Sequence, residues 1–403
     1  MSELADKVVV AGVGYSQIGR STGRSEGSLA VEASKAALDD AGLGVADLDG
    51  IAMWPDRVSS VFEGPSIVYM YRALGLSDVR YYQAMGAGPG QFGAVNGAIH
   101  AIAAGAADTV ICIRAHLRQE QRFFVPGAGD ARRPTGDLAL RAPYGVPAGA
   151  PRYALWAQRH AHEYGTTDEH RGAVVLTCRA HAQLNPRAVW HGHPLTMEDY
   201  LASDMVASPL RILDCDMPVD GAVAIILTRA DRADSLRKQP VRIHSLGHGN
   251  GPTLDTEYWP DMTVMSSRWA ADQMWAGTDL GPADVDVAQL YDGFSSMALC
   301  WLEDLGFVKK GEAGPWFAEG RGRLGGDLPV CTDGGHLGGG RLHGFGKLAE
   351  AVQQFGASAA TARCPAPRWP WPASAAARWP LRCCWLRVED ERERTLTDEP
   401  GRR

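Results

Sequence analysis

The stretch LGVADLD at Leu43–Asp49 recurs in the second half of the chain as LGPADVD at Leu280–Asp286. In both copies a helix-like segment precedes the match and an apolar, strand-like run follows it. A helix–loop–strand corner can arise twice independently, but the shared context on both sides favours a duplication. The repeat therefore predicts two similar α/β halves that join near residue 235.

Short apolar runs alternate with amphipathic stretches of helical length around the first copy. The pattern predicts strands at 8–13, 81–85, 109–113 and 222–227, and helices at 28–41 and about 91–105. Gly42 is expected to end the first helix, since glycine adopts the left-handed conformation that closes a helix. Strands and helices in alternation are typical of an α/β fold with a largely buried sheet.

The region 115–208 interrupts this alternation, because it is rich in Arg, His, Pro and Gly. It is interpreted as an insertion packed over the α/β core, with helices at about 152–164 and 168–184. The predicted organisation is an N-terminal half at 1–235 that includes the insertion, a C-terminal half at 236–355, and an atypical tail at 356–403.

The tail differs from the rest of the chain in composition. No Asp or Glu occurs between Gly356 and Arg387, whereas five Arg and four Trp do. The pattern has neither helical nor strand periodicity. One hypothesis is a shifted reading frame, which would remove two strands from the C-terminal half; the alternative is a divergent, partly disordered tail. Resequencing the gene distinguishes the two.

Charge and cysteine content exclude several classes of protein. The 403 residues contain 40 basic and 47 acidic side chains, a net charge of −7, which gives no support to nucleic-acid binding. No apolar run reaches the roughly 18 residues that a membrane span needs, and the polar start lacks a signal-peptide core. The eight cysteines form no CxxC pair. We expect them to be reduced and the protein to be cytoplasmic.

Three local motifs are weak candidates for ligand sites. Gly12–Gly19 resembles a dinucleotide fingerprint, but its spacing is GxGxxxxG, which favours a tight turn after a strand. His191–Pro194, which contains Gly-His-Pro, is expected to be a surface turn. A zinc site is possible on the predicted helices, but a solvated face is favoured for the four histidines at helical spacing, namely His160, His162, His170 and His181.

The glycine-rich run Gly334–Gly346 is a stronger candidate. So many glycines indicate a backbone that approaches another group closely, with N–H groups able to bind an oxyanion or a phosphate. The alternative is close packing of a helix start on a sheet. Arg341 and His343 project from this run. The turns at Tyr291–Phe294 and Gly86–Gly90 also follow predicted strands, which is where α/β proteins bind ligands.

Taken together, these residues resemble the thiolase superfamily, specifically its sterol-carrier and lipid-transfer branch. The resemblance extends from about Val8 to Gln354 and implies the duplicated, five-layered αβαβα thiolase fold. Besides the two candidate turns, the segments that carry it are Ala36–Leu43, Asp47–Ile51, Asn185–Pro186, Pro209–Arg211 and Asp214–Ala222.

The sequence departs from working thiolases at the nucleophile. Met85 stands where the resemblance places a cysteine, and a thioether cannot form an acyl-enzyme. The histidine of the thiolase Gly-His-Pro loop aligns with Arg341, or with His343 after a small gap. These departures make the chain similar to the thiolase-like aldolases, which release propionyl-CoA from steroid side chains by retro-aldol cleavage of a β-hydroxyacyl-CoA.

The resemblance implies roles for individual residues. Tyr291 is expected to be an acid/base, His343 an assisting acid/base and Arg341 an enolate-stabilising group. The residues expected to bind the substrate or its oxyanion are Met85, Gly86, Asp292, Gly334 and Gly335. No metal and no cofactor is expected, with CoA present only as part of the substrate.

The resemblance also implies a homodimer and a small partner with an OB-like domain and a zinc ribbon. Two other functions stay open at this point. One is acyl transfer of the acetyl-CoA acetyltransferase type with another nucleophile. The other is non-catalytic binding of an acyl-CoA or lipid.

Overall fold

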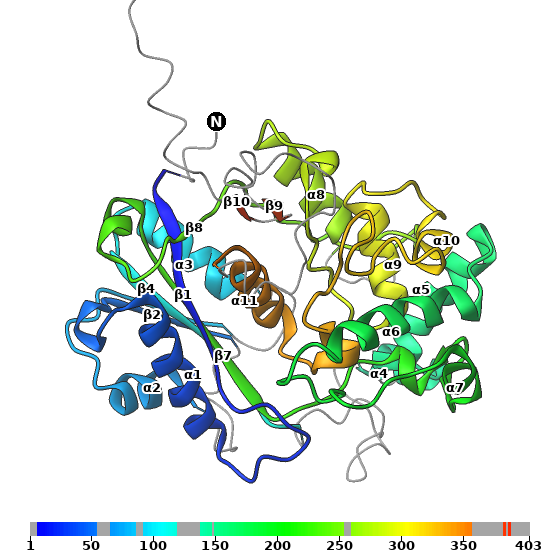
Figure 1. The fold of residues 1–403 in the computed structure, drawn as a ribbon, viewed down its shortest axis with the longest axis horizontal. Coiled ribbons are helices and arrows are strands. Elements are labelled where there is room, and N and C mark those ends of the chain that lie inside the picture. Colours follow the sequence, from blue (N-terminus) through cyan, green and yellow to red (C-terminus); the bar gives the residue numbers. More distant parts are fainter. Residues whose placement is uncertain are drawn as a thin grey trace, which may run out of the picture.

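The computed structural model describes residues 6–54, 65–85, 92–118, 138–146, 149–253, 259–356, 382–383 and 386–387. Its centre is a mixed sheet (Figure 1). In sheet order the described strands are β3 (Tyr81–Ala84), β2 (Gly50–Met53), β4 (Thr109–His116), β7 (Gly221–Arg229), β1 (Val8–Tyr15), β8 (Val241–Arg242), β10 (Leu386–Arg387) and β9 (Arg382–Cys383). β2 runs parallel to both β3 and β4, and every other pairing between described strands of this sheet is antiparallel.

Helices cover both faces of this sheet. Alternate residues of β7 divide between two cores: Ala224 packs with α1 (Glu26–Ala41) and α2 (Ile67–Leu74), and Ile225 packs with α3 (Gly93–Ala103) and α11 (His343–Gly356). The sheet is therefore buried on both sides, as its continuous apolar strands predict. Gly42, with φ 73°, ends α1 as expected.

The glycines of the GxGxxxxG motif have a packing role. Gly12 and Gly14 lie inside β1 rather than in a turn after it. A Cβ on Gly14 would lie 2.2 Å from the backbone nitrogen of Ala37 in α1. The expectation of a tight turn at this point was wrong, because the glycines allow α1 to lie directly against the strand.

The internal repeat has the same local structure in both copies. In each, the aspartate side chain accepts a hydrogen bond from the glycine N–H three residues earlier, at 2.9 Å for Asp47 with Gly44 and 3.0 Å for Asp284 with Gly281. β2 follows the first copy. In the second copy, the structure has bridge residues at Val287 and Ala288 in place of an extended strand, and the described partner is Val330, which pairs in parallel with Ala288.

The insertion and the C-terminal half pack against each other. The insertion contains α4 (Leu138–Arg141), α5 (Gly149–Tyr164), α6 (Asp168–Ala182), α7 (Met197–Ala202) and β5 (Met205–Ala207), and β5 pairs with β6 (Leu210–Arg211) just after it. The C-terminal half adds α8 (Ser267–Ala276), α9 (Ser295–Asp304) and α10 (Ala313–Ala318). Residues of α6, α9 and α10 share one core, which fixes α6 beside the glycine-rich run.

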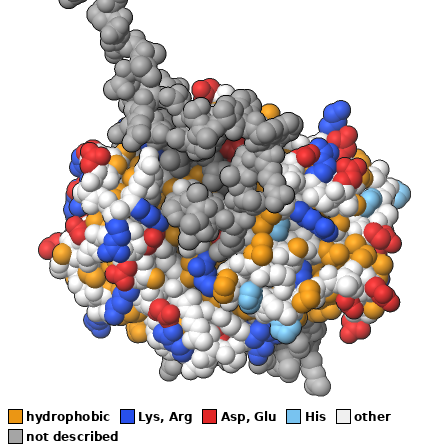
Figure 2. All heavy atoms as spheres, in the orientation of Figure 1, with side chains coloured by type: hydrophobic (Ala, Val, Ile, Leu, Met, Phe, Trp, Pro, Cys, Tyr) orange, Lys and Arg blue, Asp and Glu red, His pale blue; other side chains and the backbone are white. Residues whose placement is uncertain are grey.

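The face in Figure 2 carries Lys or Arg and Asp or Glu side chains interspersed, without a patch of one sign. Within the described part of the chain, no helix has both the length and the hydropathy to cross a membrane. Most of the tail lies outside the described residues. Its two short strands continue the sheet, with Arg387 of β10 opposite Arg242 of β8.

Candidate active site

Tyr291 lies in the turn between the Ala288 bridge and α9. Phe294 has extended backbone angles immediately before α9 begins, so the turn is short and its side chains are held close to the helix start. The Tyr291 ring is half-buried and packs edge-on against His336, with ring centroids 5.0 Å apart. The Tyr291 ring is therefore held against the glycine-rich run.

Asp292 ties this turn to the glycine-rich run. Its fully buried carboxylate accepts hydrogen bonds from the backbone N–H of His336 at 2.9 Å and of Leu337 at 3.3 Å. The ammonium of Lys347 lies 2.6 Å from the same carboxylate. Burial alone would raise the pKa of Asp292, but the charge of Lys347 and the N–H donors lower it. The ionised carboxylate of Asp292 thus holds the Tyr291 turn against the glycine-rich run, and it is not exposed to a substrate.

The glycines at the start of the run pack closely against the Asp292 carboxylate. Gly334 and Gly335 have φ angles of 100° and 62°, and a Cβ on Gly335 would lie 2.0 Å from Asp292 Oδ2. Their N–H groups are used within the loop: Gly334 donates to the Cys331 carbonyl at 2.9 Å and Gly335 to Asp333 Oδ1 at 2.8 Å. In the structure these two glycines therefore allow close packing and hydrogen bonding within the loop, rather than the substrate binding expected for them.

Arg341 forms a buried ion pair with Asp216. Its Nη1 lies 2.9 Å and 3.1 Å from the two carboxylate oxygens. Asp216 also donates its backbone N–H to the carbonyl of Gly293, so the pair lies beside the Tyr291 turn. Burial raises the pKa of Asp216 to about 6, against the opposing effect of Arg341. Sequence reasoning did not assign a function to Asp216, although it matched the segment that contains it.

His343 begins α11 with φ 55°, a left-handed conformation that is costly for a residue other than glycine. Its half-buried ring contacts side chains that no motif had singled out. Trp54 and His116 lie edge-on at centroid distances of 5.1 Å and 5.6 Å, and Arg114 Nη2 lies 3.2 Å from His343 Nδ1. His336 Nε2 donates to the His343 carbonyl at 3.0 Å. Because His336 also packs against the phenol, it connects the two predicted acid/base residues.

Met85 follows β3, at the start of the segment that leads into α3. A Cβ on Gly93 would lie 2.4 Å from its Cε, so the thioether packs against the first turn of α3. Phe92, the residue before Gly93, packs against Gly344, which follows His343 in the chain. Met85, His343 and Tyr291 thus belong to one continuous set of contacts. Gly86 lies outside the described residues.

Four cysteines lie where a thiolate is disfavoured. The five cysteines whose side chains are described are buried and free of disulfides; they are Cys112, Cys178, Cys215, Cys300 and Cys331. Burial raises the pKa of the thiol in Cys112, Cys215 and Cys300. A hydrogen bond with Cys331, together with burial, raises that of Cys178. Acyl-enzyme chemistry needs a thiolate, and these environments oppose its formation.

One group among the described residues has the spacing of a metal site. Cys178, Asp292 and Cys331 place ligand atoms within 4.8 Å of one another. The Lys347 ammonium lies 2.6 Å from Asp292 and donates to Cys331 Sγ at 3.2 Å. The Lys347 ammonium therefore occupies the position that a metal ion would take next to the Asp292 carboxylate.

The weaker motifs also have clear places in the structure. The turn that contains Gly192 is exposed, as expected. The expectation of a solvated face was wrong for His160 and His181. His160 is buried between Thr166 and Glu303, at 2.7 Å and 3.0 Å. His181 is buried too, because α6 packs against the glycine-rich run in the C-terminal half.

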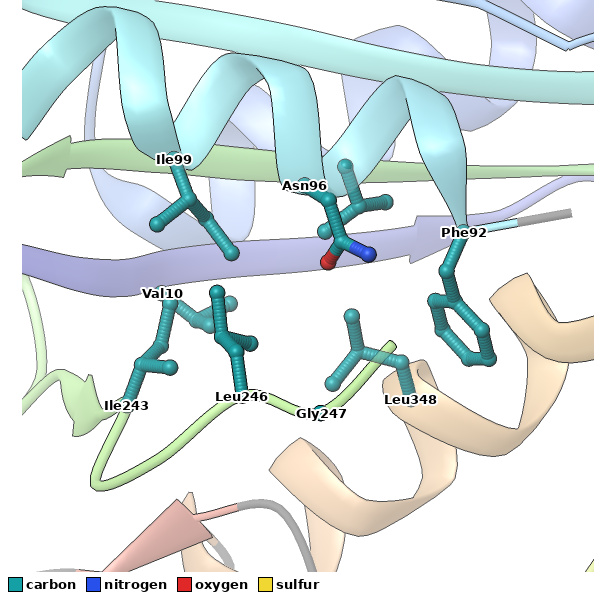
Figure 3. A pocket seen from close by; sticks show the side chains of 9 residues that line it. Val10, Phe92, Asn96, Ile99, Ile243, Leu246, Gly247 and Leu348 are labelled. Carbon is teal, nitrogen blue, oxygen red and sulfur yellow. The ribbon is translucent and has the colours of Figure 1, made fainter. Parts of the chain in front are cut away.

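An apolar pocket has a lining that does not include Tyr291 (Figure 3). It is enclosed by α3, β1, α11 and the segment after β8, and its empty volume is about 480 Å³ including open solvent. Its lining residues are Val10, Phe92, Val95, Asn96, Ile99, Ile243, Leu246, Gly247 and Leu348. None of these side chains is ionisable, so the pocket offers no acid or base.

Comparisons with known proteins identify the fold and its relatives. The family model described as "Thiolase C-terminal domain-like" matches residues 252–369. The chain is 37% identical over 361 residues to a 17-hydroxy-3-oxo-4-pregnene-20-carboxyl-CoA lyase of Mycobacterium tuberculosis, covering 87% of this chain and 92% of the relative. This chain belongs to the thiolase superfamily. It falls in the lipid-transfer branch and has the duplicated thiolase fold, as predicted.

Two further comparisons place this thiolase-superfamily chain among aldolases. It is 35% identical over 362 residues to a steroid side-chain-cleaving aldolase of Thermomonospora curvata, covering 88% of the chain and 91% of the relative. A solved structure named "Ltp2-ChsH2(DUF35) aldolase" superposes with a TM-score of 0.80 at 33% identity, covering 91% of this chain and 94% of that one.

Proposed function

We propose that this protein is a thiolase-like aldolase that cleaves a β-hydroxyacyl-CoA by a retro-aldol reaction. The observation that supports this most directly is that His336 packs against the Tyr291 ring and donates to the backbone carbonyl of His343. Met85 stands where the resemblance places the nucleophilic cysteine. Relatives that are similar over most of the chain are named as a lyase and an aldolase. By the same similarity, the acyl group is that of a steroid side chain.

The reaction needs a base at the β-hydroxyl and donors at the thioester oxygen. Tyr291 in its phenolate form takes the hydroxyl proton, the bond between the α- and β-carbons breaks, and the electron pair of that bond enters the thioester to give an enolate. The Tyr291 phenol formed in this step then returns the proton to the α-carbon. The products are a shorter acyl-CoA and a ketone or aldehyde. CoA enters as part of the substrate, and no other cofactor is proposed.

Arg341 favours the enolate electrostatically, because its fixed guanidinium charge lies beside the Tyr291 turn. Asp216 holds that guanidinium in place and partly offsets its charge. Arg341 cannot serve as the base, since a guanidinium has only hydrogen-bond donors and stays protonated in proteins. Proton transfer is therefore assigned to Tyr291, with His343 as the second polar side chain of the site.

The test is incubation of the purified protein with a β-hydroxyacyl-CoA and detection of both products by mass spectrometry. We expect Tyr291→Phe to lower kcat by about 10²–10⁴-fold, the usual contribution of a positioned acid/base. Tyr144→Phe is the matched control, since Tyr144 is 83% exposed, and its rate should equal that of the unmodified protein. An unchanged rate for Tyr291→Phe would remove the phenol from the mechanism.

Binding of the acyl-CoA without turnover would support the non-catalytic alternative instead. A covalent acyl-enzyme trapped on any side chain would support acyl transfer. The assay is run with and without a small partner protein, because the name of the solved structure, "Ltp2-ChsH2(DUF35) aldolase", gives two components. We propose a partner with an OB-like domain and a zinc ribbon for this chain too, and a cytoplasmic location in which its thiols stay reduced.

We also propose a homodimer through the N-terminal half. β3 is the outer strand at one end of the sheet formed by the described strands, and an outer strand has one row of backbone groups unpaired within the sheet. Tyr82 on this strand is 71% exposed, and α2 exposes three further large side chains, namely Val68, Tyr69 and Tyr71. A second copy meeting this edge would cover them.

A further inference from the structure

The side chain of His343 is held from three directions by residues of the N-terminal half. Trp54 follows β2, and Arg114 and His116 lie on β4, which runs parallel to β2. The Arg114 guanidinium lies 4.7 Å from the centroid of the Trp54 ring, a cation–π contact that limits its movement. The strained φ of His343 is thus supported by packing from strands that are distant in the sequence.

The contact between Arg114 and His343 specifies where the imidazole proton lies. A guanidinium has only donors and stays protonated. With Arg114 Nη2 at 3.2 Å, His343 Nδ1 has to be the acceptor. In a neutral imidazole the remaining proton is then on Nε2. Nε2 becomes a hydrogen-bond donor on the part of the ring turned away from Arg114.

We propose that Arg114 is a positioning residue that fixes neutral His343 as its Nε2–H tautomer, so that His343 donates a hydrogen bond to the enolate oxygen. This inference rests on the proposed retro-aldol function. His343 keeps its proton throughout the reaction: the hydroxyl proton goes to Tyr291, and the electron pair of the broken bond goes into the thioester. The imidazole is an oxyanion donor rather than the assisting base that the sequence suggested.

The surroundings of the ring favour its neutral form. Burial lowers the pKa of His343 well below its usual value, and Arg114, Arg341, His116 and His336 lower it further. An imidazolium would place another positive charge among these groups. A neutral donor gives up no proton as the enolate forms, and its hydrogen bond strengthens as negative charge develops on the oxygen.

The tautomer can be measured without any assay of activity. In protein labelled with ¹⁵N at histidine, the His343 signals are assigned as those lost in His343→Gln. We expect an unprotonated Nδ1 and a protonated Nε2 from pH 6 to pH 8. Arg114→Lys, which keeps a cationic donor, should preserve this pattern, whereas Arg114→Met should give a mixture of tautomers. A protonated Nδ1 in the unmodified protein would overturn the proposal.

Kinetics test the catalytic consequence. Arg114→Met should lower kcat by about 10²–10³-fold, the usual loss for one oxyanion donor, with a smaller change in KM. His343→Gln keeps a side-chain N–H and should retain more activity than His343→Leu. Equal losses in the Gln and Leu variants, or a full rate in Arg114→Met, would contradict the donor role even if cleavage is established.

These outcomes separate the two proposals. If the protein cleaves no β-hydroxyacyl-CoA, the function fails while the ¹⁵N measurement still reports the tautomer. If Arg114→Met does not fold, as thermal unfolding would show, the unmodified protein and the two His343 variants decide the question.

Discussion

At the residue scale, the site depends on one buried ion pair as much as on its reactive groups. Lys347 and Asp292 lie 2.6 Å apart with almost no exposure, and Asp292 also holds two N–H groups of the glycine-rich run. Burial would lower the pKa of Lys347, but the charge of Asp292 beside it raises the pKa well above its usual value. Each charge is therefore stable in the interior because the other is present.

Removing one member of this pair should be costly. We expect Lys347→Met to lower the free energy of unfolding by about 3–5 kcal/mol, because Asp292 is left as an unpaired buried charge. Urea denaturation measures the loss, and Lys309→Met, at an exposed position, is the control. Lys347→Met combined with Asp292→Asn should lose less than the sum of the single variants. Strict additivity would show that the two charges do not interact.

The pair also predicts a dependence of stability on pH. The folded pKa of Asp292 is lowered below its unfolded value, which is about 4. Its stabilising contribution is therefore complete above about pH 4 and decreases as the pH falls through the folded pKa. Asp292→Asn should flatten this part of a plot of unfolding free energy against pH. An unchanged slope in that variant would assign the acid sensitivity to other carboxylates.

At the scale of elements, the glycine-rich run is shaped by what it touches. Gly335 has a left-handed backbone and would bring a Cβ to 2.0 Å from Asp292 Oδ2. Gly325 also has a left-handed backbone, with φ 84°, but no atom lies within 4 Å of its Cβ position. The two positions share the same backbone requirement and differ in their surroundings.

Alanine at these two positions separates backbone strain from contact. Gly325→Ala should cost about 1–2 kcal/mol, the price of a left-handed backbone for an L-residue, and leave kcat unchanged. Gly335→Ala should lower the melting temperature further and reduce kcat at least tenfold, because the clash moves the run away from Tyr291. Thermal unfolding and product formation measure both effects. Equal behaviour of the two variants would mean that the contact with Asp292 does not position the run.

At the scale of the whole molecule, the two halves contribute unequally to the site. The N-terminal half supplies β3, β2, β4, β7 and β1 of the sheet and the residues around His343, while β8 and the tail supply the other described strands. The C-terminal half supplies Tyr291 and the glycine-rich run, and among the described residues its predicted strand pairs through the bridge between Ala288 and Val330. Under the reading-frame hypothesis, the shifted tail lacks two strands of this half, and the original frame would encode them.

The proposed dimer is tested at the same scale. We expect a dimer by light scattering coupled to gel filtration, with Tyr82→Lys shifting it toward monomer because it places a charge on the outer strand. Tyr144→Lys introduces the same charge at another exposed tyrosine and should not change the mass. A monomeric unmodified protein, or a dimer equally stable in Tyr82→Lys, would place the contact elsewhere or exclude it.

The features that the sequence predicted well depend on neighbouring residues. The helix that ends at Gly42, the strands of the N-terminal half and the repeated turn at Asp47 and Asp284 follow from local periodicity and from hydrogen bonds three residues apart. Tyr291 and His343 were identified because they lie in recognisable segments. After the second repeat, Val287 and Ala288 have bridge pairing rather than an extended strand in the described part of the chain, because a strand needs partners that the local pattern does not supply.

Sequence alone thus determined the α/β class, the duplication and the residues at the candidate turns, since these are recorded in short-range patterns. Tertiary structure alone decided that Trp54, Arg114 and His116 surround His343, and that Asp216 pairs with Arg341. Periodicity shows which face of a strand is buried, but not which side chain lies across from it. Those partners come from distant segments, and only packing of the two halves brings them within hydrogen-bond distance.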